Sequence, residues 1–202
     1  PHRMPSIHRS ALVEHSAARM FDLVNDVAAY PRRFAWCEQA QVLEQDEGRM
    51  LARLDLGLGK LSTWFTTENR LERPHRIDMQ LRDGPFRKLH GLWEFHALDE
   101  SACKVSLTLD FEPGSRLLGP VFTLGFQGLA DRMVDDFVRV ADGGHHEDHV
   151  APHVEHRGGH RADALGHVAA HTAQAAALPD RLQQLLEPYR IEHMALAARR
   201  FL

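Results

Sequence analysis

The chain has 202 residues, of which 44% are hydrophobic and 26% charged, and its formal net charge is -4. This length suffices for one well-cored domain with residues to spare. The net charge gives no global reason to expect nucleic-acid binding, although the sum does not exclude a local basic patch. No run of about 18 apolar residues is present that could span a membrane. With no secretory signal and two cysteines in no metal-type spacing, Cys37 and Cys103, the sequence predicts a soluble cytoplasmic protein with reduced thiols.

The first forty residues predict a strand and then helical segments. Residues 6–13 form the predicted strand, and residues 16–27 form an amphipathic helix with Ser16 as its N-cap. The apolar stripe of this helix consists of Met20, Phe21, Val24 and Val27. Residues 28–34 are predicted to continue as a short helical or turn segment that Pro31 breaks.

The next part of the chain alternates between apolar and polar residues, the period of two that is typical of strands with one wet face. Short connections between these segments predict a meander of hairpins. The six predicted strands are residues 37–45, 49–58, 60–71, 76–83, 87–98 and 102–112.

A long amphipathic helix is predicted over residues 117–142, with Pro120 in its first turn. Its apolar stripe consists of Phe122, Phe126, Leu129, Met133, Phe137 and Val140. The pairs Arg132/Asp136 and Asp135/Arg139 are predicted to lie on its exposed side. The fold class is therefore α+β, with one seven-stranded antiparallel sheet and one long helix that covers it.

The composition changes near Asp142, which divides the chain into a predicted domain of residues 4–142 and a tail of residues 143–202. Nine of the fifteen histidines lie beyond residue 142, in a segment with much alanine and few large apolar groups. Two short helices are predicted near its end. Two interpretations of the tail stay open: a genuine low-complexity extension, or a GC-rich gene read in another frame, with Met4 as the natural start.

One glycine interrupts the apolar face of the strand in "GPFRKLHGLWEF", residues 84–95. Gly91 lies between Leu89 and Trp93, where it weakens the strand and packs nothing itself. Either it allows the closing helix, at Phe122 and Phe126, to approach the sheet, or it allows a bend in a curved strand, or it leaves room for a ligand in an open cavity.

Several blocks resemble the RatA-like and coenzyme-Q-binding, polyketide-cyclase-like proteins of the START-related superfamily. The blocks are "LVNDVAAYP" with "WC", "FTTEN", "GPFRKLHGLWEF", "CKVSLTLDFE" and "MVDDFV", in this order over about residues 4 to 140. The resemblance implies a helix-grip fold, in which a seven-stranded sheet surrounds a long C-terminal helix and an apolar tunnel. The arginines of "YPRRFAWC" and the tail after "MVDDFV" depart from the family pattern.

Two functions follow from this resemblance. The first is non-enzymatic binding of an isoprenoid quinone of the ubiquinone type, or another apolar small molecule, in support of the respiratory chain. The expected ligand-binding residues are Phe34, Trp36, Phe65, Leu89, Gly91, Trp93, Phe95, Phe122, Phe126 and Met133. The alternative is a ribosome association toxin that binds the large ribosomal subunit and blocks subunit joining. Its candidate contacts are Arg32, Arg33, Arg82, Arg87 and Lys88.

No motif for catalysis is present: the domain has no nucleophile elbow, no HExxH and no glycine-rich phosphate loop. His90 and His96 alternate with the apolar positions of their strand and are expected on the surface, and Cys37 is expected to be a buried thiol. Histidine pairs at i,i+4 occur between His145 and His171, but Pro152 and two glycines break any continuous helix there. We therefore expect no enzyme, no resident metal and no cofactor, apart from a quinone as bound ligand.

Overall fold

The alternating segments of the sequence build one antiparallel sheet. In the computed structural model, which describes residues 6–114, 119–143, 180–181 and 184, seven strands pair in the order β1-β7-β6-β5-β4-β3-β2. The strands are β1 (Ser6–Val13), β2 (Cys37–Gln45), β3 (Arg49–Leu58), β4 (Leu61–Glu72), β5 (Arg76–Asp83), β6 (Phe86–Asp99) and β7 (Ala102–Pro113). The strands from β2 to β7 follow one another as hairpins, and β1 pairs with β7. The predicted fold class is confirmed.

Helix α1 (Ala17–Asn25) follows β1 and begins where the sequence predicted. The Ser16 side chain accepts a hydrogen bond from the backbone N–H of Arg19 at 3.1 Å, which satisfies one of the unpaired donors at the helix start. The buried stripe of α1 is Ala17, Met20, Phe21 and Val24. Packing of this stripe against β6 and β7 holds the helix on the sheet.

Two short helical segments then lead to β2. They are η1 (Val27–Ala29) and α2 (Tyr30–Arg33). The expected break at Pro31 was wrong, because this proline lies in the first turn of α2, where its missing N–H has no helical partner to lose.

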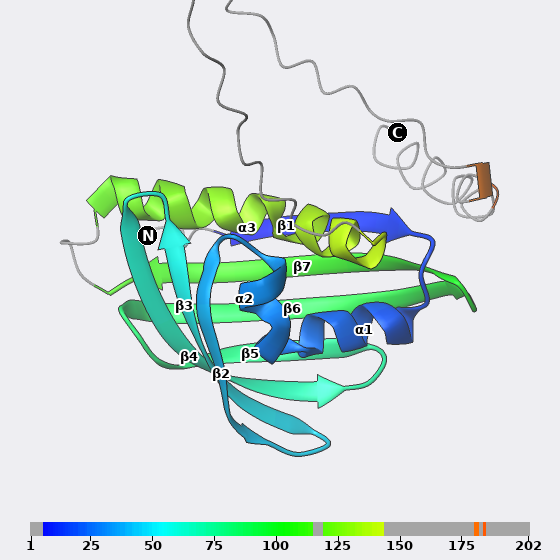
Figure 1. The fold of residues 1–202 in the computed structure, drawn as a ribbon, viewed down its shortest axis with the longest axis horizontal. Helices are drawn as coiled ribbons and strands as arrows, with labels where there is room; N and C mark the ends of the chain where they lie inside the picture. The colour runs from blue at the N-terminus through cyan, green and yellow to red at the C-terminus, as the bar shows by residue number, and fades with distance from the viewer. Residues whose placement is uncertain (1–5, 115–118, 144–179, 182–183, 185–202) are drawn as a thin grey trace, which may run out of the picture. The chain divides into compact units, whose positions relative to one another are not determined.

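The long helix α3 (Gly119–Ala141) packs against β1, β7 and β3. Since β1 and β3 lie far apart in the strand order, contact of one helix with both requires the sheet to curl around it. Figure 1 shows α3 running alongside β1 and β7, with α1 and α2 against the same sheet. This is the helix-grip arrangement that the resemblance implied.

The concave face of the sheet carries the apolar side chains. On β6 the buried residues are Phe86, Leu89, Gly91, Trp93 and Phe95. His90 and His96 lie between them on the opposite, exposed face, as predicted. On β4 the side chains of Thr63, Phe65 and Thr67, at every second position, are likewise buried. The period of two in the sequence therefore assigned these residues to the correct sides of the sheet.

All strands and helices named above belong to one compact unit that runs from Pro1 to His146. Within the predicted tail, residues 180, 181 and 184 are helical and exposed, inside one of the short helices expected there. The other predictions for residues 144–202, including the histidine pairs, lie outside the described residues.

Candidate ligand cavity and basic surface

A cavity of about 60 Å³ lies within the concave side of the sheet, and most of its wall is apolar. Seven of the ten predicted ligand-binding residues line it: Trp36, Phe65, Leu89, Gly91, Trp93, Phe126 and Met133. The sequence therefore found much of the wall of this cavity.

The other three predicted residues, Phe34, Phe95 and Phe122, do not line the cavity but pack against neighbouring rings. Phe34 stacks on Trp36 with ring centroids 4.8 Å apart, and the Phe95 ring lies 5.7 Å from that of Phe21. The Phe122 ring lies 5.6 Å from that of Phe86. Alternation alone cannot separate a ring that faces a cavity from one that fills the core beside it.

The cavity is small for a quinone as it is packed here. A cavity of about 150 Å³ lined by apolar side chains is known to accept benzene, and this one has less than half that volume. A ring with an isoprenoid tail would therefore fit only if wall residues moved.

Gly91 lines the cavity, but the space left by its missing side chain is occupied by Met79 and not by helix α3. A Cβ atom built on Gly91 would lie 2.3 Å from Cε of Met79 and 3.3 Å from Cδ1 of Leu109. Met79 is the backbone partner of Gly91 on the adjacent strand β5. Of the alternatives left open for Gly91, close approach of the helix at Phe122 and Phe126 does not account for this space, since the tip of the Met79 side chain occupies it.

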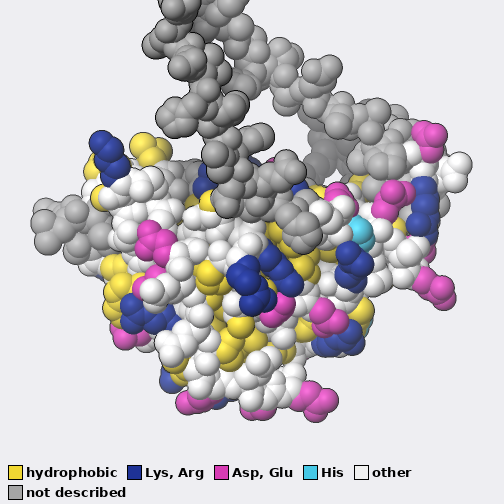
Figure 2. All heavy atoms as spheres, viewed as in Figure 1, with side chains coloured by type: hydrophobic (Ala, Val, Ile, Leu, Met, Phe, Trp, Pro, Cys, Tyr) yellow, Lys and Arg dark blue, Asp and Glu magenta, His cyan; other side chains and the backbone are white. Residues whose placement is uncertain are grey.

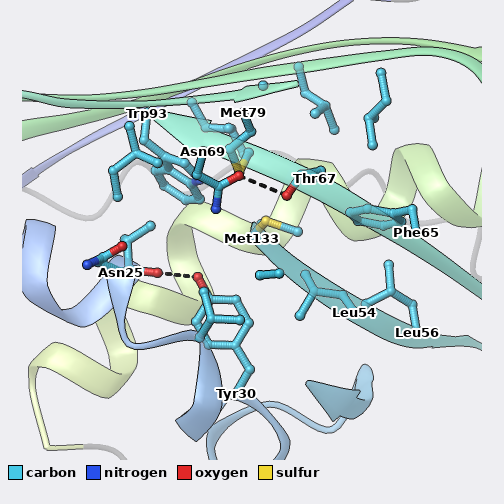
Figure 3. A pocket seen from close by; sticks show the side chains of 18 of the residues that line it. Asn25, Tyr30, Leu54, Leu56, Phe65, Thr67, Asn69, Met79, Trp93 and Met133 are labelled. Atoms are coloured by element: carbon cyan, nitrogen blue, oxygen red, sulfur yellow. Dashed lines mark hydrogen bonds between the residues drawn. The ribbon is translucent and has the colours of Figure 1, made fainter. Parts of the chain in front are cut away.

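Polar side chains interrupt the apolar wall, and the sequence analysis missed them. Asn69 and Thr67 lie on the inner face of β4, and the Thr67 hydroxyl donates to Oδ1 of Asn69 at 2.8 Å. Figure 3 shows these side chains beside the cavity, with Asn25 and Tyr30 across from them. Extending the alternation of Phe65 and Thr67 by two residues in "FTTEN" would have placed Asn69 inside.

On the opposite wall, the Tyr30 hydroxyl donates to the backbone carbonyl of Val24. The Asn25 Oδ1 atom is buried and has no hydrogen-bond partner among the described residues. Burial raises the pKa of the Tyr30 hydroxyl, so that the hydroxyl stays protonated and keeps donating. This wall thus contains no ionised group.

A buried carboxylate joins α3 to the chain that precedes β2. Asp136 is 7% exposed and accepts a hydrogen bond from Nε1 of Trp36 at 3.0 Å, while Arg139 contacts its other oxygen at 2.5 Å. The prediction of Asp136 as an exposed residue was therefore wrong. Arg139 pairs with Asp136, one turn away, instead of the predicted Asp135.

Both cysteines are buried, as was expected for Cys37, and their thiols are not poised for nucleophilic attack. Burial raises the pKa of Cys37 to about 12, with a further contribution from the nearby carboxylates Asp55 and Glu38. Burial also raises the pKa of Cys103 to about 11. Because the thiolate is the reactive form, neither side chain has the properties of a catalytic cysteine at neutral pH.

The five predicted ribosome contacts fall on two elements, α2 and the β5–β6 hairpin. Figure 2 shows basic side chains gathered over α2, with acidic ones beside them. Three of the five arginines and lysines are paired: Arg33 with Asp26 at 2.9 Å, Arg82 with Glu68 at 3.4 Å and Arg87 with Glu112 at 3.2 Å.

Arg32 and Lys88 differ from these three. Both are exposed, and neither forms an ion pair with another residue in the described ranges. Their charges are therefore the least compensated of the predicted set.

Within the described ranges, no cluster of three His, Cys, Asp or Glu side chains could hold a metal ion. None of the helices described there is long and apolar enough to cross a membrane. The expectation that the chain has no cofactor stays a prediction.

Comparison with known proteins places this fold among characterised families. Residues 13–138 match the family described as polyketide cyclase / dehydrase and lipid transport. The ribosome association toxin RatA of Pseudomonas aeruginosa is 47% identical over 139 residues, which cover 67% of this chain and 94% of that protein.

Two further proteins are more distant. The mitochondrial coenzyme Q-binding protein COQ10 homolog B of Xenopus laevis is 25% identical over 136 residues, covering 65% of this chain and 56% of that one. A solved START superfamily protein from Mycobacterium smegmatis has a TM-score of 0.58 at 20% identity, covering 68% of this chain and 97% of that one. The latter supports the fold alone.

Proposed function

The chain belongs to the polyketide cyclase / dehydrase and lipid transport family, and we propose that it is a ribosome association toxin. The observation that carries this proposal is the similarity to a toxin of that name over nearly the whole length of the toxin. The family match spans residues 13–138, which include strands β2 to β7 and most of α3, so it does not depend on one local motif.

The proposed mode of action is binding to the large ribosomal subunit in the cytoplasm, which blocks the joining of the subunits. Association with ribosomal RNA depends on Lys and Arg side chains that neutralise phosphates and release counterions. Arg32 and Lys88 suit this role best among the predicted contacts, because no acidic partner competes with the phosphate for them.

We infer a binding role rather than catalysis, for two reasons. The cavity wall holds a single titratable side chain, Tyr30, whose hydroxyl is already engaged with a backbone carbonyl. Both thiols in the described part of the chain are buried and protonated at neutral pH. General acid–base or nucleophilic chemistry needs groups that change protonation near the working pH.

The test is sedimentation of the full chain with purified ribosomal subunits through a sucrose gradient at several salt concentrations. We expect the protein to travel with the large subunit and to lower the fraction of joined ribosomes. The double variant Arg32→Glu/Lys88→Glu should weaken binding, and the slope of log K against log salt should fall by about 1.4 to 1.8.

The matched control is Lys60→Glu, which reverses one exposed charge on the β3–β4 hairpin outside the predicted set. It should bind as the parent does. Failure of the parent to travel with either subunit would remove the ribosome proposal, whatever the variants do.

A second candidate function is the binding of an apolar small molecule, with an isoprenoid quinone as the first choice. The apolar cavity and the similarity to a coenzyme Q-binding protein favour it. The small volume of the cavity counts against a quinone in this packing. Mass spectrometry of an organic extract of the full chain, purified from a quinone-producing host, tests it: co-purifying quinone supports this function, and its absence counts against it.

A further inference from the structure

Within the described part of the chain, two amide side chains in the cavity wall have an unused hydrogen-bonding group: Asn25 has a free acceptor, Oδ1, and Asn69 has a free donor, Nδ2. Asn69 is 4% exposed, and its Oδ1 atom accepts the hydrogen bond from Thr67. This bond holds the amide plane, so that the Nδ2 group is directed away from Thr67 and into the cavity, as Figure 3 shows. No other described residue accepts a hydrogen bond from this nitrogen.

The described side chains around the Asn69 amide provide no acceptor for its Nδ2 group. The neighbouring wall residues Trp93, Met79 and Met133 have no strong acceptor to offer. A buried N–H group without an acceptor is unfavourable, and buried polar groups in proteins are generally paired with protein, water or ligand. The Asn69 amide therefore supplies a donor suited to an acceptor atom that enters the cavity.

The wall beside Asn69 can yield. The Met79 side chain lies over Gly91, with its methyl group in the space that a side chain at residue 91 would otherwise fill. Methionine is unbranched and adapts its rotamers at low cost. Rotation of Met79 away from Gly91 would extend the cavity over β6 and β7, where Leu89 of β6 and Leu109 of β7 continue the apolar wall.

We propose that this cavity is a binding site for a small apolar molecule with one carbonyl oxygen, which accepts a hydrogen bond from Nδ2 of Asn69 while Met79 moves off Gly91 to admit the apolar part. Thr67 is the positioning residue that fixes the amide. Aromatic and aliphatic ketones belong to this chemical class, and a quinone would present one of its two ring carbonyls to Asn69. The inference rests on the second candidate function and is independent of ribosome binding.

The test uses two probes of nearly the same shape, acetophenone and ethylbenzene, which differ by a carbonyl oxygen in place of two hydrogens. Binding to the full chain is followed by NMR, with amide ¹H–¹⁵N shifts including the side-chain NH₂ of Asn69. We expect both probes to bind and only acetophenone to shift the Asn69 side-chain signals strongly.

Variants then isolate the hydrogen bond. Asn69→Leu should weaken acetophenone relative to ethylbenzene by about 2- to 10-fold, the range of one neutral hydrogen bond. Thr67→Val, which keeps the branched shape but loses the hydroxyl, should reduce this selectivity in part. Met79→Ala should strengthen the binding of both probes by a similar factor.

The matched control is Thr63→Val, a buried polar residue on the same strand that does not line the cavity. It should leave both affinities unchanged. Equal effects of Asn69→Leu on the two probes, with no shift of the Asn69 signals in the parent, would overturn the role of Asn69 while leaving a ligand cavity in place. If neither probe binds up to its solubility, the inference and the second candidate function both fail, and the ribosome proposal is unaffected.

Discussion

Two parts of the interior are packed in different ways. The aromatic cluster, defined as Tyr30, Phe34, Trp36 and Phe137, consists of rings whose centroids lie 4.6 to 6.0 Å apart. The cavity region, defined as Asn69, Met79, Gly91 and Met133, combines flexible thioethers, a missing side chain and a buried amide. Tyr30 and Trp36 also line the cavity and so form the boundary between the two parts.

The two regions also differ in whether their polar groups have hydrogen-bond partners. In the aromatic cluster, both oxygens of the adjacent Asp136 are engaged, one by Trp36 and one by Arg139. In the cavity region, half of the Asn69 amide has no protein partner among the described residues. Rigid rings and satisfied polar groups favour one fixed packing, whereas methionines and an unused donor permit the wall to change. We therefore assign stability to the first region and adaptability to the second.

The largest effect is expected from Phe137→Ala in the aromatic cluster. Phe137 is fully buried and contacts Tyr30, Phe34 and Trp93, so truncation should lower the free energy of unfolding by about 3–5 kcal/mol. Urea unfolding measures this. The comparison variant Met79→Ala, beside an existing cavity, should cost less, and an equal cost would end the distinction between the two regions.

A smaller loss is expected from Asp136→Ala, which leaves the Trp36 N–H without its acceptor in a buried site. The free energy of unfolding should fall by about 1–3 kcal/mol. Asp136→Asn retains an acceptor and should cost less. Thermal melts of both variants measure the difference. If Asp136→Ala were as stable as the parent, this carboxylate would not hold α3 to the segment before β2.

Gly84, which lies against the cavity-lining Phe65, and Gly91 of the cavity region should respond differently to alanine. Gly84 has a φ of 140°, and a Cβ there would lie 2.9 Å from Cβ of Phe65 and 3.1 Å from backbone atoms. Gly84→Ala should therefore destabilise by about 1–3 kcal/mol.

Gly91→Ala should cost under about 1 kcal/mol, because the conflicting atom is the flexible end of Met79. The loss of stability caused by the same Gly→Ala change at the two positions thus measures how readily the neighbouring atoms move to admit a Cβ atom. A larger loss at Gly91 than at Gly84 would contradict an adaptable cavity wall.

The smallest effect is expected at the surface, where Arg73 pairs with Asp22 of α1 at 2.7 Å. The hydrogen bond from Arg73 holds the pKa of Asp22 below its ordinary value of 3.8. Its contribution to stability is therefore present above that pH and is lost as the pH falls through the lowered pKa. Both side chains are 56% exposed, so Asp22→Asn should cost only about 0–1 kcal/mol at pH 7. Thermal melts at pH 7 and pH 2 check this, since the variant and the parent should converge in acid.

Local patterns predicted most of the fold because each was set by few residues. The strand bounds follow from alternation, since a one-residue slip would turn every apolar side chain of a strand to water. The start of α1 follows from Ser16, whose side chain caps the helix. The apolar part of the cavity wall was found in the same way. By contrast, the role of Met79 over Gly91 depends on the pairing of β5 with β6, which no segment encodes by itself.

The sequence by itself determined the seven-stranded sheet, the long closing helix and the inward position of residues such as Phe65, Leu89 and Trp93, because periodicity and capping act over a few neighbouring residues. Only the tertiary structure decided which inward residues face the cavity, which ring lies against which, and that Asp136 is buried beneath Trp36. It also decided that Asn69 meets apolar neighbours with its donor unused. These outcomes depend on contacts between segments that are distant in the chain, where volume and hydrogen-bond partners are fixed only once the sheet has closed around α3.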